Sequence, residues 1–395
     1  MRLLHVIASV RAAGGGPTEA IRSLSAVHLR DGHSAEVLSL DDPADAELRS
    51  FPLPVYALGP ARGHYGFTPA CVPWLRQNRS RYDAVIIHGL WQYHSFAAWR
   101  ALHSTSTPYY VFPHGMLDPW FKRTYPWKHL KKWLYWPWAD YRVLRNARAV
   151  LFTCEQEKLL APQSFALYRA RPVITGLGTA APSGIDASHF LDRYPELSGK
   201  RLLLFMGRLH PKKGCDLLLE AYAATLAKDP AWRLVYAGPD ALSTQQTLTA
   251  RAAALGILDR VVWTGMLRDI MKWSVLAASE VFALPSHQEN FGIAVAEALA
   301  CDVPVLISRE VNIWREIESA RAGFVAADTI EGTTSLLRRW QELPEAERST
   351  MRGNAQQCFR EHFNIEQSAN RLLAVIEETT SKSASQQVSE SAKED

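Results

Sequence analysis

Short apolar runs alternate along this chain with segments in which apolar residues recur every three or four positions. The runs lie at Leu3–Ala8, Ala35–Leu40, Asp83–His88, Tyr109–Phe112 and Ala149–Thr153, then near 201–206, 233–237, 261–264, 281–284 and 303–307. Short uninterrupted apolar runs separated by helical periodicity are typical of buried parallel strands. The pattern therefore predicts an α/β protein in which a β–α alternation begins twice.

A polar segment separates the two sets of strands. It begins with the turn Pro182-Ser-Gly-Ile-Asp186 and continues to Lys200, which indicates a domain junction. The expected division is an N-terminal Rossmann-like domain at 1–185, a C-terminal one at 186–365, a helix at 366–378 that crosses back onto the first domain, and a tail at 379–395. We expect disorder in the tail, because it contains Ser, Gln, Lys and Glu with almost no apolar residues.

Composition narrows the class of protein. The chain has 395 residues, a formal net charge of +4 and five cysteines without a C-x-x-C pair. So small a charge gives no support to a nucleic-acid partner. The scattered cysteines indicate a reducing compartment, with neither a disulfide framework nor a zinc site. No apolar run suits a signal peptide or reaches spanning length, so we expect a cytoplasmic protein, soluble or peripheral to a membrane.

The segment from Ser286 to Glu297 carries the most informative chemistry. It follows the predicted strand Val281–Leu284 and enters a helical pattern, so Glu289 lies at the carboxyl end of a strand, where open α/β sheets bind ligands. The backbone N–H groups around Phe291, Gly292 and Ile293 would point out of the helix N-terminus, where an anion is favoured. A nucleotide sugar suits this arrangement, with Glu289 near the sugar and Glu297 near the ribose. Alone, two such glutamates would indicate only an ordinary strand–helix unit.

A second turn lies about eighty residues upstream. The apolar run that ends at Met206 enters Gly207-Arg208-Leu-His-Pro-Lys-Lys213-Gly214, a glycine-rich turn that precedes a helical pattern. A guanidinium and an ammonium can offset the charge of a diphosphate leaving group. A basic turn after a strand is usually a solvated loop. In the same chain as the Glu289–Glu297 segment, it favours an anion site.

Together with the turn Ala237-Gly-Pro-Asp240, these motifs resemble the donor domain of family 4 (group 1) retaining glycosyltransferases of the GT-B fold, over about residues 1–380. The resemblance implies two Rossmann-like domains facing a cleft and hexosyl transfer from a UDP- or GDP-linked sugar, without cofactor or metal. It implies that Arg208 and Lys213 hold the diphosphate, that Glu289 is catalytic beside the transferred sugar, and that Glu297 holds the ribose. The other donor-binding residues are Asn290, Phe291, Gly292 and Ile293. One turn departs from the family pattern, because Ser183 replaces an Asn.

The first half offers further candidates. Gly14–Gly16 follow the first strand, but Glu19 takes the third glycine position of a dinucleotide fingerprint, which disfavours a dehydrogenase with Asp41 at its ribose. The resemblance instead assigns Gly15 and Gly16 to the donor phosphate or the acceptor. It also makes His114, in a turn after a strand, a second catalytic residue beside the transferred sugar. Asp118 either joins it or caps that turn, and His88–Trp91 either line the acceptor side or pack.

Residues 120–148 interleave aromatic side chains with Lys and Arg. One interpretation is a surface helix that docks on anionic lipid headgroups at the inner face of the membrane. The other is a core helix whose lysines are solvated, and nucleic-acid stacking is disfavoured. We expect a lipid-linked glycan acceptor in bacterial surface polysaccharide synthesis. The alternatives are a sugar-nucleotide epimerase or hydrolase of the same fold, and a nucleotide-binding or membrane-docking protein without enzymatic activity.

Overall fold

The chain folds into two compact units. The computed structural model describes residues 1–11, 15–181, 184–240 and 242–391, without the side chains of 382–391. The first unit comprises Met1–Gly178 together with the chain from Ile365 onward, and the second comprises Thr179–Asn364. The first boundary therefore precedes the expected residue 185, and Pro182 and Ser183 of the expected junction turn lie outside the described residues.

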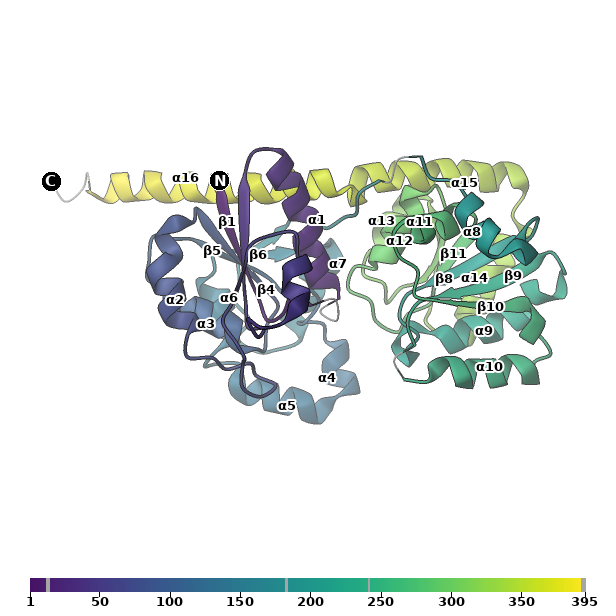
Figure 1. The fold of residues 1–395 in the computed structure, drawn as a ribbon, viewed down its shortest axis with the longest axis horizontal. Helices are drawn as coiled ribbons and strands as arrows, with labels where there is room; N and C mark the ends of the chain where they lie inside the picture. The colour runs from purple at the N-terminus through teal and green to yellow at the C-terminus, as the bar shows by residue number, and fades with distance from the viewer. Residues whose placement is uncertain (12–14, 182–183, 241, 392–395) are drawn as a thin grey trace. The chain divides into compact units, whose positions relative to one another are not determined.

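The first unit contains a seven-stranded sheet whose strands all pair in parallel (Figure 1). Its strands are β1 (Arg2–Ile7), β2 (Ser34–Ser39), β3 (Val55–Ala57), β4 (Ala84–His88), β5 (Tyr109–Phe112), β6 (Ala149–Phe152) and β7 (Pro172–Ile174). They lie in the order β3-β2-β1-β4-β5-β6-β7. The sequence pattern missed β3 and β7, because each is a three-residue edge strand without a fully buried side chain.

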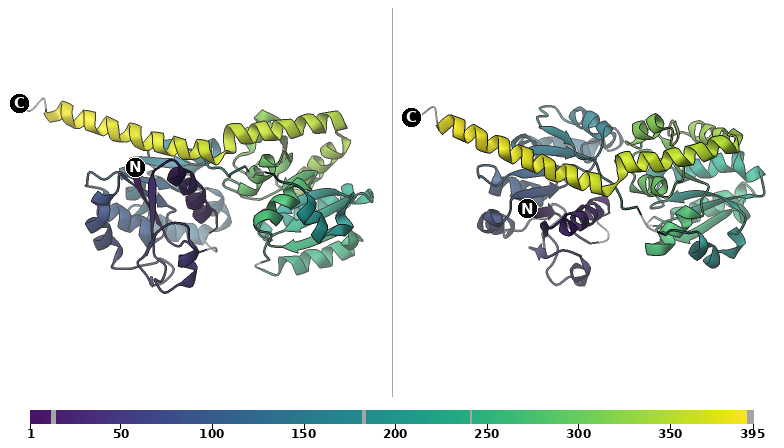
Figure 2. Two further views of the ribbon diagram at one scale, coloured as in Figure 1. Left: turned by 45° about the horizontal axis from the view of Figure 1, so that its top comes forward. Right: turned by 90° about the horizontal axis from the view of Figure 1, so that it is seen from above.

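Helices cover both faces of this sheet. The helices of this unit are α1 (Gly16–Arg30), α2 (Cys71–Asn78), α3 (Tyr93–Leu102), α4 (Trp120–Thr124), α5 (Pro126–Tyr135), α6 (Asp140–Asn146), α7 (Glu155–Leu160) and α16 (Ile365–Ser391). One apolar core joins the sheet to α2, α3 and α6. A second joins it to α1 and α16, which lie side by side (Figure 2), and has Leu24 and Leu372 among its buried residues.

Helix α16 continues past the point where a disordered tail was expected to begin at residue 379. It is helical through Ser391, and residues 392–395 lie outside the described part. Its first turns are anchored by Ile365, Leu372 and Ile376 in the core of the first unit. Once a helix is nucleated, each added residue contributes one backbone hydrogen bond, so polar residues without Pro or Gly continue it.

The second unit contains a six-stranded parallel sheet in the order β10-β9-β8-β11-β12-β13. Its strands are β8 (Arg201–Met206), β9 (Trp232–Ala237), β10 (Val261–Gly265), β11 (Val281–Leu284), β12 (Val305–Ser308) and β13 (Gly323–Ala326). Its helices are α8 (Ser188–Arg193), α9 (Cys215–Ala224), α10 (Thr244–Ala254), α11 (Asp269–Ala277), α12 (Ile293–Ala300), α13 (Trp314–Ala320), α14 (Ile330–Glu342) and α15 (Glu345–Cys358).

Each sheet has one point where the strand order reverses direction. In the first unit this point lies between β1 and β4, and in the second between β8 and β11. Open α/β sheets bind ligands outside the carboxyl ends of the strands at such a point. The turns from Gly207 to Gly214 and from Pro285 to Gly292 therefore flank the expected binding position of the second unit. Within the described residues, the helices are too short or too polar to cross a membrane.

Candidate active site

The turn after β8 is packed against the turn after β11 through a glycine. Gly214 has φ +66°, and a Cβ added there would lie 2.1 Å from the carbonyl oxygen of Pro285. The N–H of His287 donates to the carbonyl of Lys212 at 2.9 Å. Only glycine tolerates both this φ and this approach without strain. The two turns are thus locked together, which fixes the position of Lys213.

Lys213 and Glu289 meet in a direct ion pair. Both side chains are largely buried, with 22% and 19% of their surfaces exposed. Burial first, and then the nearby Lys212 and Arg208 cations, lower the pKa of Lys213 to about 8. The adjoining Glu289 carboxylate favours the charged ammonium, so Lys213 remains a cation at pH 7. Arg208, on the same turn, is exposed and has no ion-pair partner in the described part of the chain.

Glu289 is held by its own backbone. Its N–H donates to the carbonyl of Glu310 at 2.9 Å, and its carbonyl accepts from the N–H of Asn312 at 3.0 Å. Gly292 then turns the chain with φ +75° and begins α12, whose first turn has no side-chain cap. The free end of this helix is favourable to an anion. A backbone fixed on both sides places the carboxylate beside that end with little freedom.

The remaining predicted residues of this segment divide into polar and packing positions. The side chain of Asn290 accepts a hydrogen bond from the Asn312 amide at 3.5 Å. Phe291 is buried, and its ring packs edge-on against Phe363 with centroids 5.7 Å apart. Ile293 is the first residue of α12. Phe291 and Ile293 can therefore serve a ligand through their backbone N–H groups, as predicted, while the Phe291 ring serves the core.

Glu297 has a partner that the sequence did not suggest. It is buried on α12, and Nζ of Lys272 from α11 donates to its carboxylate at 2.7 Å. Lys272 also lies 4.3 Å above the ring of Trp273. The position of Lys272 in the sequence was the signal that could have found it. A helix that follows a parallel strand starts at the carboxyl edge of the sheet, and Lys272 is in the first turn of such a helix.

His114 lies in the corresponding edge of the first unit. It follows β5 with φ +50°, and its Nε2 is 3.0 Å from Nδ1 of His88, at the end of β4. Burial lowers the pKa of His114 to about 4, so the ring is neutral at pH 7. His88 is buried and also contacts His5 on β1. Asp118 caps the turn, because its carboxylate accepts from the N–H of Trp120 at 2.8 Å.

The turn after β1 contains the glycines predicted for the donor or acceptor. Gly15, with φ +68°, precedes α1, and a Cβ added at Gly15 or Gly16 would meet no atom within 4 Å. Gly14 lies outside the described residues. Open space on both glycines allows a ligand to approach the backbone here.

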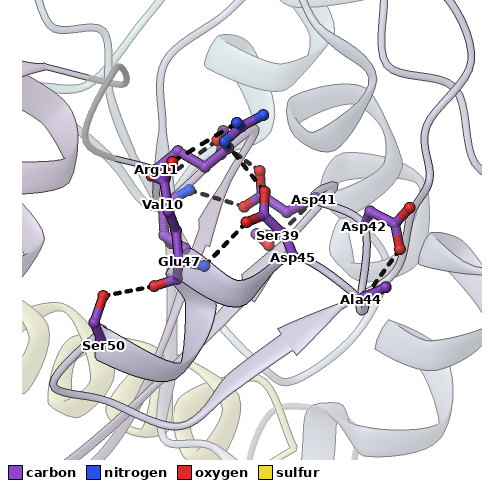
Figure 3. Close-up of polar contacts among 10 residues, drawn as sticks. Val10, Arg11, Ser39, Asp41, Asp42, Ala44, Asp45, Glu47 and Ser50 are labelled. Atoms are coloured by element: carbon purple, nitrogen blue, oxygen red, sulfur yellow. Dashed lines mark hydrogen bonds and ion pairs between the residues drawn. The ribbon is translucent and has the colours of Figure 1, made fainter.

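Asp41 supports this turn. Its two carboxylate oxygens accept from Oγ of Ser9 at 2.6 Å and from the N–H of Val10 at 2.9 Å. Figure 3 shows Asp41 beside Val10. Nearby, Arg11 pairs with Asp45 at 3.2 Å and with Glu47 at 3.7 Å. These contacts join the loop after β2 to the loop after β1.

The aromatic and basic stretch 120–148 divides into an exposed and a packed part. Helix α5 has no buried side chain, and Trp127, Leu134 and nearby Trp138 are 78%, 71% and 69% exposed. By contrast, Trp136 and the apolar residues of α6 are in the core. Lys132 is half-buried, with Nζ 4.4 Å from the centre of the Trp91 ring. The core-helix interpretation therefore describes the part from Trp136 onward, and lipid docking stays a prediction for the exposed helix α5.

Comparison with known families matches both units. Residues 190–357 match the family model described as "Glycosyl transferases group 1", and residues 15–178 match a "Glycosyl transferase 4-like domain". The two matches cover most of the chain, one in each unit.

Individual relatives are more distant. A D-inositol 3-phosphate glycosyltransferase of Geodermatophilus obscurus is 36% identical over 140 residues, which is 32% of this chain and 31% of that protein. The alignment thus spans about a third of that relative. A GDP-mannose:cellobiosyl-diphosphopolyprenol alpha-mannosyltransferase of Xanthomonas oryzae is 26% identical over 84% of this chain and 85% of its own length.

Solved structures share the fold. Sucrose-phosphate synthase from Thermosynechococcus elongatus superposes with a TM-score of 0.78 at 16% identity, over 97% of this chain and 100% of that one. The Anabaena protein HepE in complex with UDP gives a TM-score of 0.77 at 19% identity, over 96% and 100%.

Proposed function

Because the chain belongs to the group 1 glycosyl transferases and has the GT-B fold, we propose that it transfers a hexosyl group from a nucleoside-diphosphate sugar to an acceptor, with retention of anomeric configuration. The observation that carries this proposal is the Lys213–Glu289 ion pair between the turns after β8 and β11. It puts one cation and one carboxylate where the strand order reverses. A sugar diphosphate needs both, since charge of opposite sign develops on its two sides during transfer.

In the proposed reaction, the bond between the anomeric carbon and the diphosphate oxygen breaks, and the diphosphate leaves with the electron pair. Lys213, Arg208 and the uncapped N-terminus of α12 stabilise this negative charge. A bound diphosphate competes with Glu289 for Lys213, so the carboxylate becomes free to face the positive charge that develops on the sugar. An acceptor hydroxyl forms the new bond to the anomeric carbon and passes its proton to the departing diphosphate.

The remaining site residues hold the ends of the donor. Glu297 accepts a hydrogen bond from the Lys272 ammonium, and a carboxylate has several acceptor positions, so in this proposal it also accepts hydrogen bonds from the ribose hydroxyls. His114 contacts the transferred sugar in this proposal, and Gly15 and Gly16 let the donor phosphate or the acceptor approach the backbone.

We propose that no divalent metal is needed. The support is the positive charge already present: the Lys213 ammonium, the Arg208 guanidinium and the helix N-terminus. EDTA should therefore leave turnover largely intact. Loss of activity in EDTA, with recovery on adding Mg²⁺ or Mn²⁺, would contradict this account.

The proposed donor is UDP- or GDP-linked, and the proposed acceptor is a lipid-linked glycan of bacterial surface polysaccharide synthesis. The name of the Xanthomonas relative gives a GDP-linked mannose and a diphosphopolyprenol acceptor, and the HepE structure holds UDP. A panel of UDP-, GDP- and ADP-sugars screened by thermal shift identifies the donor, because a bound ligand raises the apparent stability. Product analysis follows, with and without a polyprenol-linked acceptor. A sugar nucleotide that is epimerised or hydrolysed equally well without acceptor would refute transfer.

A lipid-linked acceptor requires the enzyme to work at a membrane surface, and we assign docking to the exposed side chains of α5 and to Trp138, which lies after the helix. This docking surface comprises Trp127, Lys128, Leu130, Lys131, Leu134 and Trp138. Tryptophan favours the membrane interface, and each lysine near an anionic surface contributes on the order of 1 kcal/mol. The proposed location is the cytoplasmic face of the cell membrane.

Flotation with anionic vesicles tests the docking surface. Lys128→Gln combined with Lys131→Gln should release the protein from the vesicles, as should high salt. Lys132→Gln should do so less, because that lysine is half-buried against Trp91. A charge-matched control changes Lys200 and Lys228 of the second unit to Gln, and it should still float. Wild-type protein that never floats with anionic vesicles would exclude this role for α5.

A further inference from the structure

Three histidines form a hydrogen-bonded row across three adjacent strands of the first unit. His5 is on β1, His88 ends β4, and His114 follows β5. Nδ1 of His5 lies 2.9 Å from Nε2 of His88, and Nδ1 of His88 lies 3.0 Å from Nε2 of His114. The far end of the row is the hydroxyl of Ser25 on α1, whose Oγ is 3.4 Å from Nε2 of His5.

The three rings are neutral at pH 7. His5 and His88 are buried, and burial lowers the pKa of His5 to about 3, that of His88 well below its usual value, and that of His114 to about 4. A neutral imidazole carries one N–H and one lone pair. Each nitrogen–nitrogen contact in the row must then hold a single proton. Only two arrangements of the protons satisfy both contacts. Either all three rings carry the proton on Nδ1 or all three carry it on Nε2, and the direction of both hydrogen bonds is reversed between the two.

Ser25 distinguishes the two arrangements. It is buried, and in the described part of the chain its hydroxyl has one hydrogen-bond partner, Nε2 of His5. If His5 carried its proton on Nε2, the hydroxyl proton of Ser25 would be buried without an acceptor, which is unfavourable. In the opposite arrangement every donor has an acceptor. Ser25 donates to Nε2 of His5, Nδ1–H of His5 donates to His88, and Nδ1–H of His88 donates to His114.

We propose that Ser25, His5 and His88 are positioning residues that fix His114 with its proton on Nδ1. That nitrogen makes no hydrogen bond among the described residues, and His114 as a residue is half-buried rather than fully buried. His114 therefore presents an N–H to its ligand, which must offer an oxygen acceptor, such as a sugar hydroxyl or ring oxygen. It is a hydrogen-bond donor in the reaction and does not take a proton from the acceptor hydroxyl. The identity of the ligand rests on the proposed function, whereas the tautomer does not.

Nitrogen-15 NMR of the full chain without substrate tests the tautomer directly. Long-range proton–nitrogen correlations of the histidine rings at pH 7 distinguish Nδ1–H from Nε2–H, and single His→Gln variants assign the signals. We expect the Nδ1–H pattern for His5, His88 and His114. His94 is an internal reference with the opposite pattern, because its Nε2 donates to the carbonyl of His88 at 2.9 Å. A ring of His114 with its proton on Nε2 would overturn the proposal.

A matched pair of variants at Ser25 tests the cause. Ser25→Ala removes the donor that orients the row, and alanine is well tolerated in a helix. We expect His114 to lose its pure Nδ1–H pattern in Ser25→Ala and to keep it in Ser25→Thr, which retains the hydroxyl. An unchanged His114 spectrum in Ser25→Ala would overturn the role of Ser25.

Turnover of the same pair separates this inference from the proposed function. If His114 donates to the sugar, Ser25→Ala should lower kcat by about tenfold with a smaller change in donor KM, and Ser25→Thr should restore it. Altered spectra with unaltered turnover would uphold the tautomer and remove His114 from the reaction. A protein without transferase activity would leave the spectral result standing.

Discussion

Replacing Gly214 by alanine tests how the fold positions Lys213, without removing any charged group. The added Cβ would lie 2.1 Å from the Pro285 carbonyl, whereas ordinary van der Waals contacts begin at 3.4 Å. The turn after β8 must therefore move by roughly 1 Å or more. The left-handed φ of +66° adds about 1–2 kcal/mol of strain for any residue with a Cβ.

The displacement should move the Lys213 ammonium away from the Glu289 carboxylate, and so out of the position that the ion pair now gives it. A misplacement of about 1 Å can lower a rate by about a hundredfold. Loss of one hydrogen bond to a charged group weakens binding by about 1.5–3 kcal/mol, which is roughly ten- to a hundredfold in Kd. Calorimetric titration with UDP and GDP, together with turnover of the donor identified by the panel, measures both quantities.

Gly256→Ala is the matched control. Gly256 is also in the second unit, has φ +69°, and would gain a Cβ with nothing within 4 Å. It carries the same backbone strain without the collision, so its Tm should fall slightly while nucleotide binding and turnover stay near wild type. If Gly214→Ala bound the nucleoside diphosphate and turned over as well as Gly256→Ala, the packing of the two turns would have no part in positioning Lys213.

Three further predictions concern individual charges. Lys213→Ala should weaken both nucleoside-diphosphate binding and turnover more than Lys212→Ala does. Equal effects of the two variants on titration and rate would show that Lys213 was wrongly chosen over Lys212 as the diphosphate-binding lysine. With the pKa of Lys213 at about 8, diphosphate affinity should fall between pH 7 and pH 9 as the ammonium loses its proton. Lys213→Arg should remove that slope. Burial raises the pKa of Asp140 from its usual 3.8 to about 7, so its contribution to stability is complete below about pH 4 and is lost as the pH rises through 7. Relative to Asp140→Asn, denaturant unfolding of the wild type should lose at most about 4 kcal/mol over that range.

The sheets and the position of the candidate site follow from local sequence signals. The strands with buried, uninterrupted apolar runs were predictable from those runs. The turns at Gly207 and Pro285 were predictable from the residues at which two of these runs end. The direct contact of Lys213 with Glu289 was not predictable. It depends on β8 and β11 being neighbours although two strands separate them in the sequence, and single-chain periodicity carries no information on strand order.

Partners that come from distant elements were missed for the same reason. Lys272 reaches Glu297 from another helix, and His5 reaches His88 from a strand 83 residues away. In the sequence, His5 is a single polar residue in an apolar run, which is a weak signal for a role beside a candidate catalytic histidine. The helical stretch after residue 379 was missed because composition describes an isolated segment, whereas α16 extends from turns that are already anchored.

The central claim is that Glu289 acts on the charge that develops during transfer, and Glu289→Gln tests it most directly. The substitution keeps the size and the backbone contacts of the residue, and it frees Lys213 from its ion pair. Donor affinity by titration should therefore be unchanged or slightly tighter, while kcat should fall by about a thousandfold or more, because the lost interaction is made in the transition state. A Glu289→Gln enzyme with near wild-type kcat would contradict the account.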